Sequence, residues 1–387
     1  MAKRDRQSID EMMFLKGSAA IAELVSRVGP GVVAAYPITP QTGIIEYLAK
    51  LKISGQADYS FLQAESEHSA LSMVLGAAAA GALSYTATSS QGMLHMIEIV
   101  YNLAGLRLPV VMTCANRSIS APINIWNDHQ DAMAVRDAGW LMFFAENNQE
   151  AIEQHWLAFA LSQQLNLPVM VNVDGFRLTH ASEPVAMPSE KLISKIVKQR
   201  VKNLLEVNNP KTIGHFTMPI DYETQRLSLG QTIADSLVAI EKKYFELMKI
   251  WQPIKKELSG IKTIDKNDLA TVEYYGPNKA KTVIVAMGSI VGELKDLADK
   301  TNKEIADSLA ILKIKLYRPF PEQDVIKYLK NAQRVIVIDR APGLGSQPPL
   351  FTDISSVTSH QVNARLVSLI IGLGGNVQLT ELEKILK

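Results

Sequence analysis

Two polar residues follow apolar runs and could together bind a carboxylate. Residues 34–43 read AAYPITPQTG, so two prolines bracket Thr39 directly after an apolar run. Proline fixes its own φ and restricts the residue before it, which predicts a stiff, non-helical turn around the Thr39 hydroxyl. Arg117 follows a second apolar run, LPVVMTCAN, and its guanidinium is a planar fork that matches a carboxylate.

These residues are expected to meet at one edge of a sheet. A third apolar run ends in the segment NVDG, at residues 172–175. Ligands of open α/β sheets bind outside the carboxyl ends of the strands, so we predict a pocket for a small anionic substrate there. The alternative is that Arg117 pairs with a structural acid such as Asp128, and spacing alone does not decide between the two.

A second group of polar residues precedes an almost wholly apolar segment. In QAESEHSALSMVLGAA, Glu65 and Glu67 stand where a helix is expected to begin. A carboxylate at that place is favourable simply as a partner of the helix dipole. It could instead bond a ring nitrogen of a cofactor, and the residues alone leave both interpretations open. His68 is expected to be a surface residue rather than a ligand.

The segment NIWNDHQDAM carries Asp128, His129 and Asp131, a spacing that invites a metal site. A metal usually needs protein ligands that converge on one point, and a short polar segment does not show convergence. We therefore predict no metal site in this chain.

The pattern of apolar residues predicts the helices and strands that position these residues. In the first half, short β-branched runs alternate with helical patterns at residues 63–83, 92–106 and 145–164, which predicts a parallel sheet. From residue 281 the alternation resumes, with strands expected within 281–289, 311–320, 334–343 and 366–375. The prediction is an α/β protein with two doubly wound parallel-sheet domains.

The expected domains are residues 1–205 and 269–387, joined by a connector at residues 206–268. Within the connector, residues 213–226 are predicted to be loop, and a long helix from residue 227 is expected to stop near Pro253. This helix either packs across both domains, packs against a partner subunit, or is a surface helix of no special role.

The composition excludes several classes of function. Forty basic residues balance 39 acidic ones, so neither nucleic acid nor an anionic membrane is indicated as the main partner. The single cysteine, Cys114, excludes disulfides within the chain and iron–sulfur clusters held by cysteines of this chain alone. No apolar run is long enough to span a bilayer, and the first residues lack the apolar core of a signal peptide, so the cytoplasm is expected.

Motifs along nearly the whole chain, from about residue 16 to 376, resemble those of a known family. They include AAYPITPQT, QAESEHSA, TATSSQGM, ANRSISAPINIWNDHQDAMAVRDAGW, PVMVNVDGF, YRPFP and VIDRAPGLGS. In order and spacing they are similar to the α subunits of pyruvate:ferredoxin oxidoreductases, within the wider thiamine-diphosphate-dependent 2-oxoacid:ferredoxin oxidoreductases.

The resemblance implies a fold and a set of partners. The first domain corresponds to a transketolase-like pyrimidine-binding domain, and the second to the transketolase carboxy-terminal domain. A separate β subunit is expected to carry the diphosphate-binding domain and its Mg²⁺, which agrees with the lack of a G-D-G motif here. The γ subunit, a ferredoxin-like δ subunit and the [4Fe–4S] clusters complete the implied complex.

The resemblance also implies residue roles. Glu67 matches the catalytic carboxylate that hydrogen-bonds the pyrimidine nitrogen of thiamine diphosphate, and Tyr36 and Pro37 are expected beside the same cofactor. Glu65 stands where relatives tolerate other residues.

Thr39 and Arg117 match the pair that binds the carboxylate and carbonyl oxygens of the substrate, and both are expected to be catalytic. Ile125 falls near the position that packs on the methyl side of the substrate.

The implied reaction converts pyruvate and coenzyme A to acetyl-CoA and carbon dioxide and passes electrons to ferredoxin. The chain is expected to be active only with its partner subunits. Two alternatives stay open: the same chemistry on another 2-oxoacid, such as 2-oxoisovalerate or 2-oxoglutarate, and a non-catalytic transketolase-like scaffold subunit.

Overall fold

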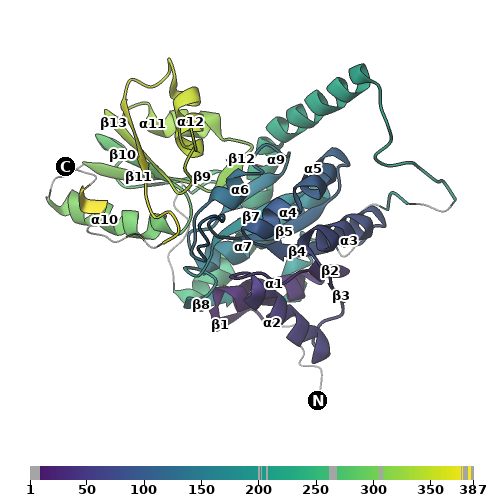
Figure 1. Ribbon diagram of the computed structural model, residues 1–387. Helices are drawn as coiled ribbons and strands as arrows, with labels where there is room; N and C mark the ends of the chain where they lie inside the picture. Colours follow the sequence, from purple (N-terminus) through teal and green to yellow (C-terminus); the bar gives the residue numbers. More distant parts are fainter. Residues whose placement is uncertain are drawn as a thin grey trace.

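The protein folds around two mainly parallel β-sheets. The computed structural model describes residues 9–198, 201, 203–205, 208–260, 268–304, 308–375, 377 and 382–384. Figure 1 shows the larger sheet at the centre of the view and the smaller sheet toward the C-terminal end of the chain, each flanked by helices. The predicted α/β class with parallel sheets is confirmed.

The larger sheet has seven strands in the order β12-β6-β7-β5-β4-β2-β3. All neighbouring pairs from β6 to β3 are parallel. The central strands β5 and β7 are buried along their whole length, as in a sheet covered on both faces. The strands of the first half are β2 (Val32–Ala35), β3 (Ser60–Gln63), β4 (Ser84–Thr88), β5 (Val110–Asn116), β6 (Leu141–Phe144) and β7 (Val169–Asp174). A separate antiparallel ribbon pairs β1 (Glu11–Lys16) with β8 (Ser182–Met187).

Each of the three regions predicted to be helical in the first half contains helix, with different ends, and the structure adds helices that were not predicted. The helix expected over 63–83 is α3 (Glu67–Ala79), because Gln63 is the last residue of β3 and Ser66 caps the helix by accepting the N–H of Ser69 at 3.1 Å. The helix expected over 92–106 is two helices that meet at Met96. The full set is α1 (Gly17–Val28), α2 (Thr42–Ile53), α3, α4 (Gln91–His95), α5 (Ile97–Gly105), α6 (Gln130–Met133), α7 (Asn148–Leu165) and α8 (Glu190–Ile193).

The smaller sheet has five strands in the order β14-β13-β10-β11-β9. The pairs β14–β13, β13–β10 and β10–β11 are parallel, and the edge strand β9 is antiparallel. All four regions predicted to be strands from residue 281 onward contain one. The elements are β9 (Val272–Tyr275), β10 (Thr282–Ala286), α10 (Ile290–Glu304), β11 (Leu309–Ile314), α11 (Glu322–Leu329), β13 (Arg334–Asp339), α12 (Pro349–Thr358) and β14 (Arg365–Ile370).

One predicted strand is divided between the two sheets. Residues 311–320 are predicted as a single strand, but β11 ends at Ile314 and β12 (Leu316–Arg318) pairs antiparallel with β6 of the larger sheet. The break falls at Lys315, whose buried Nζ lies 2.7 Å from Asp268 Oδ1 and 3.1 Å from the Tyr244 hydroxyl. These long-range contacts turn the chain, and the local sequence does not encode them.

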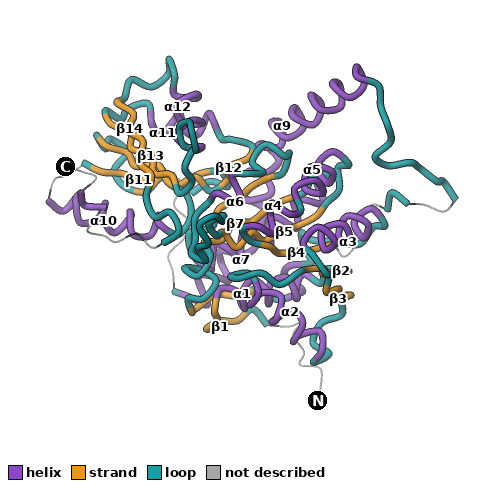
Figure 2. Tube along the Cα trace, viewed as in Figure 1, coloured by secondary structure: helices purple, strands orange, loops and turns teal. Residues whose placement is uncertain are grey.

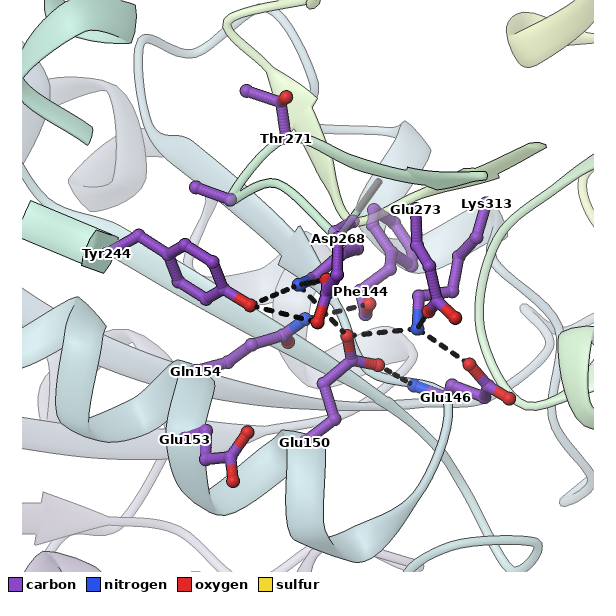
Figure 3. A network of polar contacts seen from close by, with 12 residues as sticks. Phe144, Glu146, Glu150, Glu153, Gln154, Tyr244, Asp268, Thr271, Glu273 and Lys313 are labelled. Atoms are coloured by element: carbon purple, nitrogen blue, oxygen red, sulfur yellow. Dashed lines mark hydrogen bonds and ion pairs between the residues drawn. The ribbon is translucent and has the colours of Figure 1, made fainter. Parts of the chain in front are cut away.

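A buried charge cluster lies between the two halves of the chain (Figure 3). The Nζ of Lys313, on β11, lies 2.6 Å from Glu146, 3.1 Å from Glu150 and 2.6 Å from Glu273. Burial raises the pKa of Glu273, but the cations of Lys313 and Lys295 outweigh it and hold that pKa at about 2. The cluster therefore ties Glu146 and Glu150 of the first half to the edge of the smaller sheet.

The connector helix is longer than predicted at both ends. Helix α9 (Pro219–Ser259) includes part of the segment predicted to be loop and continues through Pro253 to its αL cap at Gly260. Pro219 fits the first helical turn because the N–H it lacks has no helical partner there. Near the other end, the fully buried Trp251 packs edge-on against Trp156 at 5.9 Å, and such packing stabilises the last turns despite the proline.

Helix α9 packs across both halves of the chain. Trp251 contacts α7, and the Tyr244 hydroxyl bonds Lys315 between β11 and β12. The N-terminal part of α9 projects away from both sheets (Figure 1).

Candidate active site

The ends of three strands of the larger sheet meet at one edge, as predicted. The Nη1 of Arg117, after β5, donates to the Thr39 carbonyl oxygen, after β2, at 3.0 Å. Gly175 follows β7, and a Cβ added to it would lie 2.5 Å from Pro40 Cγ. Thr39 and Arg117 are therefore neighbours, and the roles assigned to them stay predictions.

The guanidinium of Arg117 is held by backbone oxygens rather than by an acid. Its Nε donates to the Asn124 carbonyl at 3.1 Å, whereas the Asp128 carboxylate accepts from Gln130. The structure thus does not contain the alternative Arg117–Asp128 pair. Among the residues described, no group bonds the Nη2 of Arg117, which leaves that nitrogen for a ligand.

The segment with the spacing of a metal site makes separate structural contacts. The Asp131 Oδ2 accepts the backbone N–H of Arg117 at 3.0 Å and that of Ser90 at 2.9 Å, so it joins the loops after β5 and β4. His129 Nε2 lies 2.9 Å from the Asp174 carboxylate instead. The described part of the chain holds no cluster of three metal-ligating side chains.

Asp174 joins the two sheets beside this edge. Its buried carboxylate accepts from Arg340 Nη1 at 2.9 Å and from Ser289 Oγ at 2.5 Å, both in the second half of the chain. Burial raises the pKa of Asp174, but Arg340 and His129 outweigh it and lower that pKa well below its ordinary value. Figure 2 shows loops gathered between the two sheets. Sequence reasoning did not single out Arg340 or Ser289, although each lies within a region predicted to contain a strand.

Glu67 lies on the other side of the loop that follows β4. It is the first residue of α3, is 8% exposed, and its Oε2 lies 3.1 Å from His95 Nδ1. A Cβ added to Gly92 would lie 2.9 Å from Glu67 Oε1 and 2.5 Å from Thr88 Oγ1, so the carboxylate lies directly over this loop.

Glu65 and His68, on either side of Glu67 in the sequence, do not lie over the loop after β4 as Glu67 does. Glu65 is exposed, and the hydrogen bond from the Ser69 hydroxyl lowers the pKa of Glu65. His68 lies 3.7 Å from the exposed Glu98.

The loop after β4 has the features of a ligand site. Thr88 Oγ1, Ser89 Oγ and Gln91 Nε2 are buried and have no hydrogen-bond partner among the described residues. Ser90 has φ 49° and ψ −124°, which non-glycine residues rarely adopt and which is typical of functional loops. Ser90 Oγ donates to the Ser118 carbonyl at 2.6 Å, so this loop separates the Glu67 side of the site from the Arg117 side.

Sequence reasoning named no individual residue of this loop. The signal that the sequence offers is a polar run, TSSQ, between the helices predicted at residues 63–83 and 92–106.

The remaining predicted residues lie in exposed loops of the same region. Tyr36 and Pro37 directly follow β2, and both are exposed. Ile125 is 41% exposed and follows Asn124, whose carbonyl bonds Arg117.

The sequence of this chain matches two models of known protein families. Residues 23–245 match the family described as pyruvate flavodoxin/ferredoxin oxidoreductase, thiamine diphosphate-binding. The chain belongs to this family of oxidoreductases. Residues 280–382 match the pyruvate:ferredoxin oxidoreductase core domain II, so both halves agree and the predicted family is confirmed.

Curated relatives of this oxidoreductase chain match it over almost its full length. Pyruvate synthase subunit PorA of Methanocaldococcus jannaschii is 37% identical, with 98% of this chain and 95% of that protein covered. The PorA subunit of Thermotoga maritima is 39% identical, with 95% and 92% covered. Ketoisovalerate oxidoreductase subunit VorA of Pyrococcus horikoshii is 34% identical, with 92% and 88% covered.

Solved structures share the fold of the chain. A 2-oxoglutarate:ferredoxin oxidoreductase from Magnetococcus marinus matches with a TM-score of 0.71 at 18% identity, over 98% of this chain and 66% of that one. A split-gene transketolase matches with a TM-score of 0.54 at 10% identity, over 97% and 94%. These likenesses agree with the predicted transketolase-like architecture. Within the described residues, no helix has the length and apolar character needed to cross a membrane.

The residues of the site suit the cofactor that the family binds. Thiamine diphosphate presents an aminopyrimidine ring whose nitrogens need hydrogen-bonding partners. The Glu67 carboxylate and the unpartnered atoms of Thr88, Ser89 and Gln91 supply both acceptors and donors within one loop region.

Proposed function

We propose that this chain is the α subunit of a multi-subunit pyruvate:ferredoxin oxidoreductase. The enzyme converts pyruvate and coenzyme A to acetyl-CoA and carbon dioxide and reduces ferredoxin. The observation that carries the proposal is the Arg117–Thr39 contact at the sheet edge, one loop away from Glu67, in a chain 37% identical to a pyruvate synthase subunit.

On the cofactor side, residues 1–205 form the pyrimidine-binding domain. Glu67 accepts a hydrogen bond from the aminopyrimidine ring, and Tyr36 and Pro37 lie beside the same cofactor. When bound, thiamine diphosphate supplies the carbanion chemistry, and the protein contributes binding and orientation. The near-complete burial of Glu67 strengthens such a hydrogen bond because the surrounding dielectric is low.

On the substrate side, Arg117 and Thr39 bind the 2-oxoacid. The Nη2 of Arg117 meets the carboxylate while Nε and Nη1 stay on their backbone acceptors, so the guanidinium is held in place before the substrate arrives. The Thr39 hydroxyl bonds a second substrate oxygen. Ile125 packs against the methyl end and favours a small side chain.

The partner subunits complete the enzyme. The β subunit carries the diphosphate-binding domain with Mg²⁺, and the γ and ferredoxin-like δ subunits accompany it, with the [4Fe–4S] clusters on partner subunits. The residues 269–387 form the transketolase C-terminal-like domain, and the cytoplasm is the proposed location. The similarity to a ketoisovalerate oxidoreductase subunit makes the same chemistry on a branched 2-oxoacid the second candidate.

The test uses the native complex isolated through a tag on this chain. Coenzyme-A-dependent viologen reduction is measured side by side with pyruvate, 2-oxoisovalerate and 2-oxoglutarate. We expect the highest kcat/KM with pyruvate. A preference for a bulkier acid refutes pyruvate as the substrate but keeps the reaction, and no turnover from a complex that contains thiamine diphosphate and clusters supports a scaffold role.

A further inference from the structure

One buried carboxylate bonds both loops of the candidate site. The Oδ2 of Asp131 accepts the backbone N–H of Ser90, in the loop after β4, at 2.9 Å and that of Arg117, in the loop after β5, at 3.0 Å. Its Oδ1 accepts from Asn116 Nδ2 at 2.9 Å and from the Ala132 N–H at 2.8 Å. The side chain is fully buried, so Asp131 joins the two loops from inside the fold.

The contacts of Asp131 require a carboxylate. All four groups that bond it are uncharged N–H donors, and only a side chain with acceptors at both ends of its fork satisfies them. An asparagine of the same shape would turn an NH₂ group toward two of these donors. Burying a carboxylate among uncharged groups costs free energy, and an apolar side chain would fill a position that served packing alone at lower cost. The function of Asp131 therefore lies in the groups that it bonds.

The bond to Ser90 holds an unusual backbone conformation. Ser90 has φ 49° and ψ −124°, which is costly for a residue other than glycine and persists only where the surrounding structure enforces it. Its neighbours Thr88, Ser89 and Gln91 carry buried polar atoms that have no hydrogen-bond partner among the described residues. Asp131 thus fixes the loop that presents these atoms.

The bond to Arg117 fixes the other side of the site. Asp131 holds the backbone of Arg117, while the carbonyl oxygens of Thr39 and Asn124 hold its guanidinium. Both ends of this long side chain are therefore tied to the protein. Because the same carboxylate oxygen accepts from Ser90 and from Arg117, the two backbone nitrogens are kept at a fixed separation.

We propose that Asp131 is a positioning residue that sets the place of the substrate arginine relative to the cofactor loop. The inference rests on the proposed function, in which thiamine diphosphate lies at the loop after β4 and Arg117 binds the 2-oxoacid. All four hydrogen bonds of Asp131 lie within the protein, so it acts through Ser90 and Arg117 rather than on a ligand. A misplacement of bound reactants by about 1 Å lowers a rate by about a hundredfold, so the loss of this link should affect kcat more than binding.

The test compares Asp131→Asn with Asp128→Asn in the tagged complex. Asp128 lies in the same segment and is also buried, but its carboxylate accepts from Gln130. The first measurement is hydrogen exchange by mass spectrometry in the complex freed of thiamine diphosphate and substrate. We expect D131N to exchange about tenfold faster than the wild type in residues 88–92 and 116–119, and D128N to exchange there as the wild type does. Unchanged exchange in both segments of D131N overturns the proposal, whichever 2-oxoacid is the substrate.

The second measurement is steady-state kinetics with the 2-oxoacid that the wild type converts fastest. We expect D131N to lower kcat by about a hundredfold while KM and the affinity for thiamine diphosphate change by no more than about threefold. D128N is expected to keep the wild-type kcat. A wild-type kcat in D131N, or a loss confined to KM, overturns the proposal. No turnover of any 2-oxoacid by the wild type refutes the proposed function and with it the effect of Asp131 on catalysis, while the exchange result stands by itself.

A milder variant covers the case in which D131N does not assemble, as judged by size-exclusion chromatography. Asn116→Ala removes one of the four hydrogen bonds of Asp131 and leaves its bonds to Ser90 and Arg117 in place. We expect N116A to lower kcat by about tenfold, again with KM nearly unchanged. A wild-type kcat in N116A overturns the proposal.

Discussion

Arg117 Nη1 and the Thr39 carbonyl oxygen lie 3.0 Å apart and join the ends of strands β5 and β2. The contact positions two side chains that are 78 residues apart in the sequence. It occupies one edge of the guanidinium with a backbone oxygen, and no described residue bonds the Nη2 of Arg117.

Replacing Arg117 by lysine is expected to raise the KM for pyruvate by about ten- to a hundredfold, because an ammonium group cannot bond Thr39, Asn124 and a carboxylate at once. The control is Arg136→Lys, since Arg136 forms an ion pair at 3.6 Å with its neighbour Asp137, whose side chain is exposed. Steady-state kinetics of the complex measure the effect. Equal KM values for wild type and R117K would contradict a substrate contact.

Replacing Glu67 by glutamine is expected to lower kcat by about a hundredfold or more, because an amide is a much weaker proton acceptor for the cofactor ring than a carboxylate. The matched control is Glu65→Gln, whose exposed side chain contacts Ser69 only. Thiamine diphosphate affinity is measured alongside turnover. If E67Q and E65Q turn over equally fast, Glu67 has no catalytic role and the scaffold interpretation gains support.

Replacing Ile125 by alanine is expected to enlarge the methyl end of the site and to raise kcat/KM for 2-oxoisovalerate relative to pyruvate by about tenfold, the usual size of a discrimination based on one or two methylenes. Ile123→Ala is the control, because Ile123 is the more exposed of the two, at 78% against 41%. The measurement is the ratio of kcat/KM for 2-oxoisovalerate to kcat/KM for pyruvate in each variant. The same ratio in both variants would remove Ile125 from the substrate pocket.

Replacing Lys313 by methionine is expected to destabilise the fold by about 3–5 kcal/mol, because it leaves Glu146, Glu150 and Glu273 buried with less compensating charge. The control is Lys300→Met, which removes an exposed pair with Glu383. Denaturant unfolding of the chain measures both. If K313M loses no more unfolding free energy than K300M, water or protonation of a glutamate compensates for the missing lysine charge.

The stability of the protein should also depend on Asp339 in mildly acidic solution. Burial raises the pKa of Asp339 to about 6, although the N–H groups of Leu350 and Phe351 at the start of α12 oppose the rise. A carboxyl group with a raised pKa binds its proton more tightly in the folded state, so its contribution to stability decreases as the pH rises from about 4 to about 6.

The measurement is the difference in unfolding free energy between the wild type and Asp339→Asn across that pH range. Asparagine has no proton to lose, so the wild type should become less stable relative to the variant as the pH rises. A constant difference between pH 4 and pH 7 would contradict the raised pKa.

The sequence by itself determined the fold class and the sheet edge at which the candidate site lies. The apolar runs of β5 and β7 predict buried parallel strands because both faces of such a sheet are covered, and their ends place Thr39 and Arg117 on one edge by the geometry of parallel strands. Only the tertiary structure decided the division of residues 311–320 between two sheets and the course of α9 past Pro253, since the contacts of Lys315 and Trp251 come from distant segments.

The tertiary structure likewise decided which polar groups have partners. Local sequence cannot show that Arg117 bonds backbone oxygens rather than Asp128. It also cannot show that the buried hydroxyls of Thr88 and Ser89 lack hydrogen-bond partners among the described residues. Those outcomes depend on which surfaces meet when the sheets, loops and helices pack, and packing is a property of the whole chain.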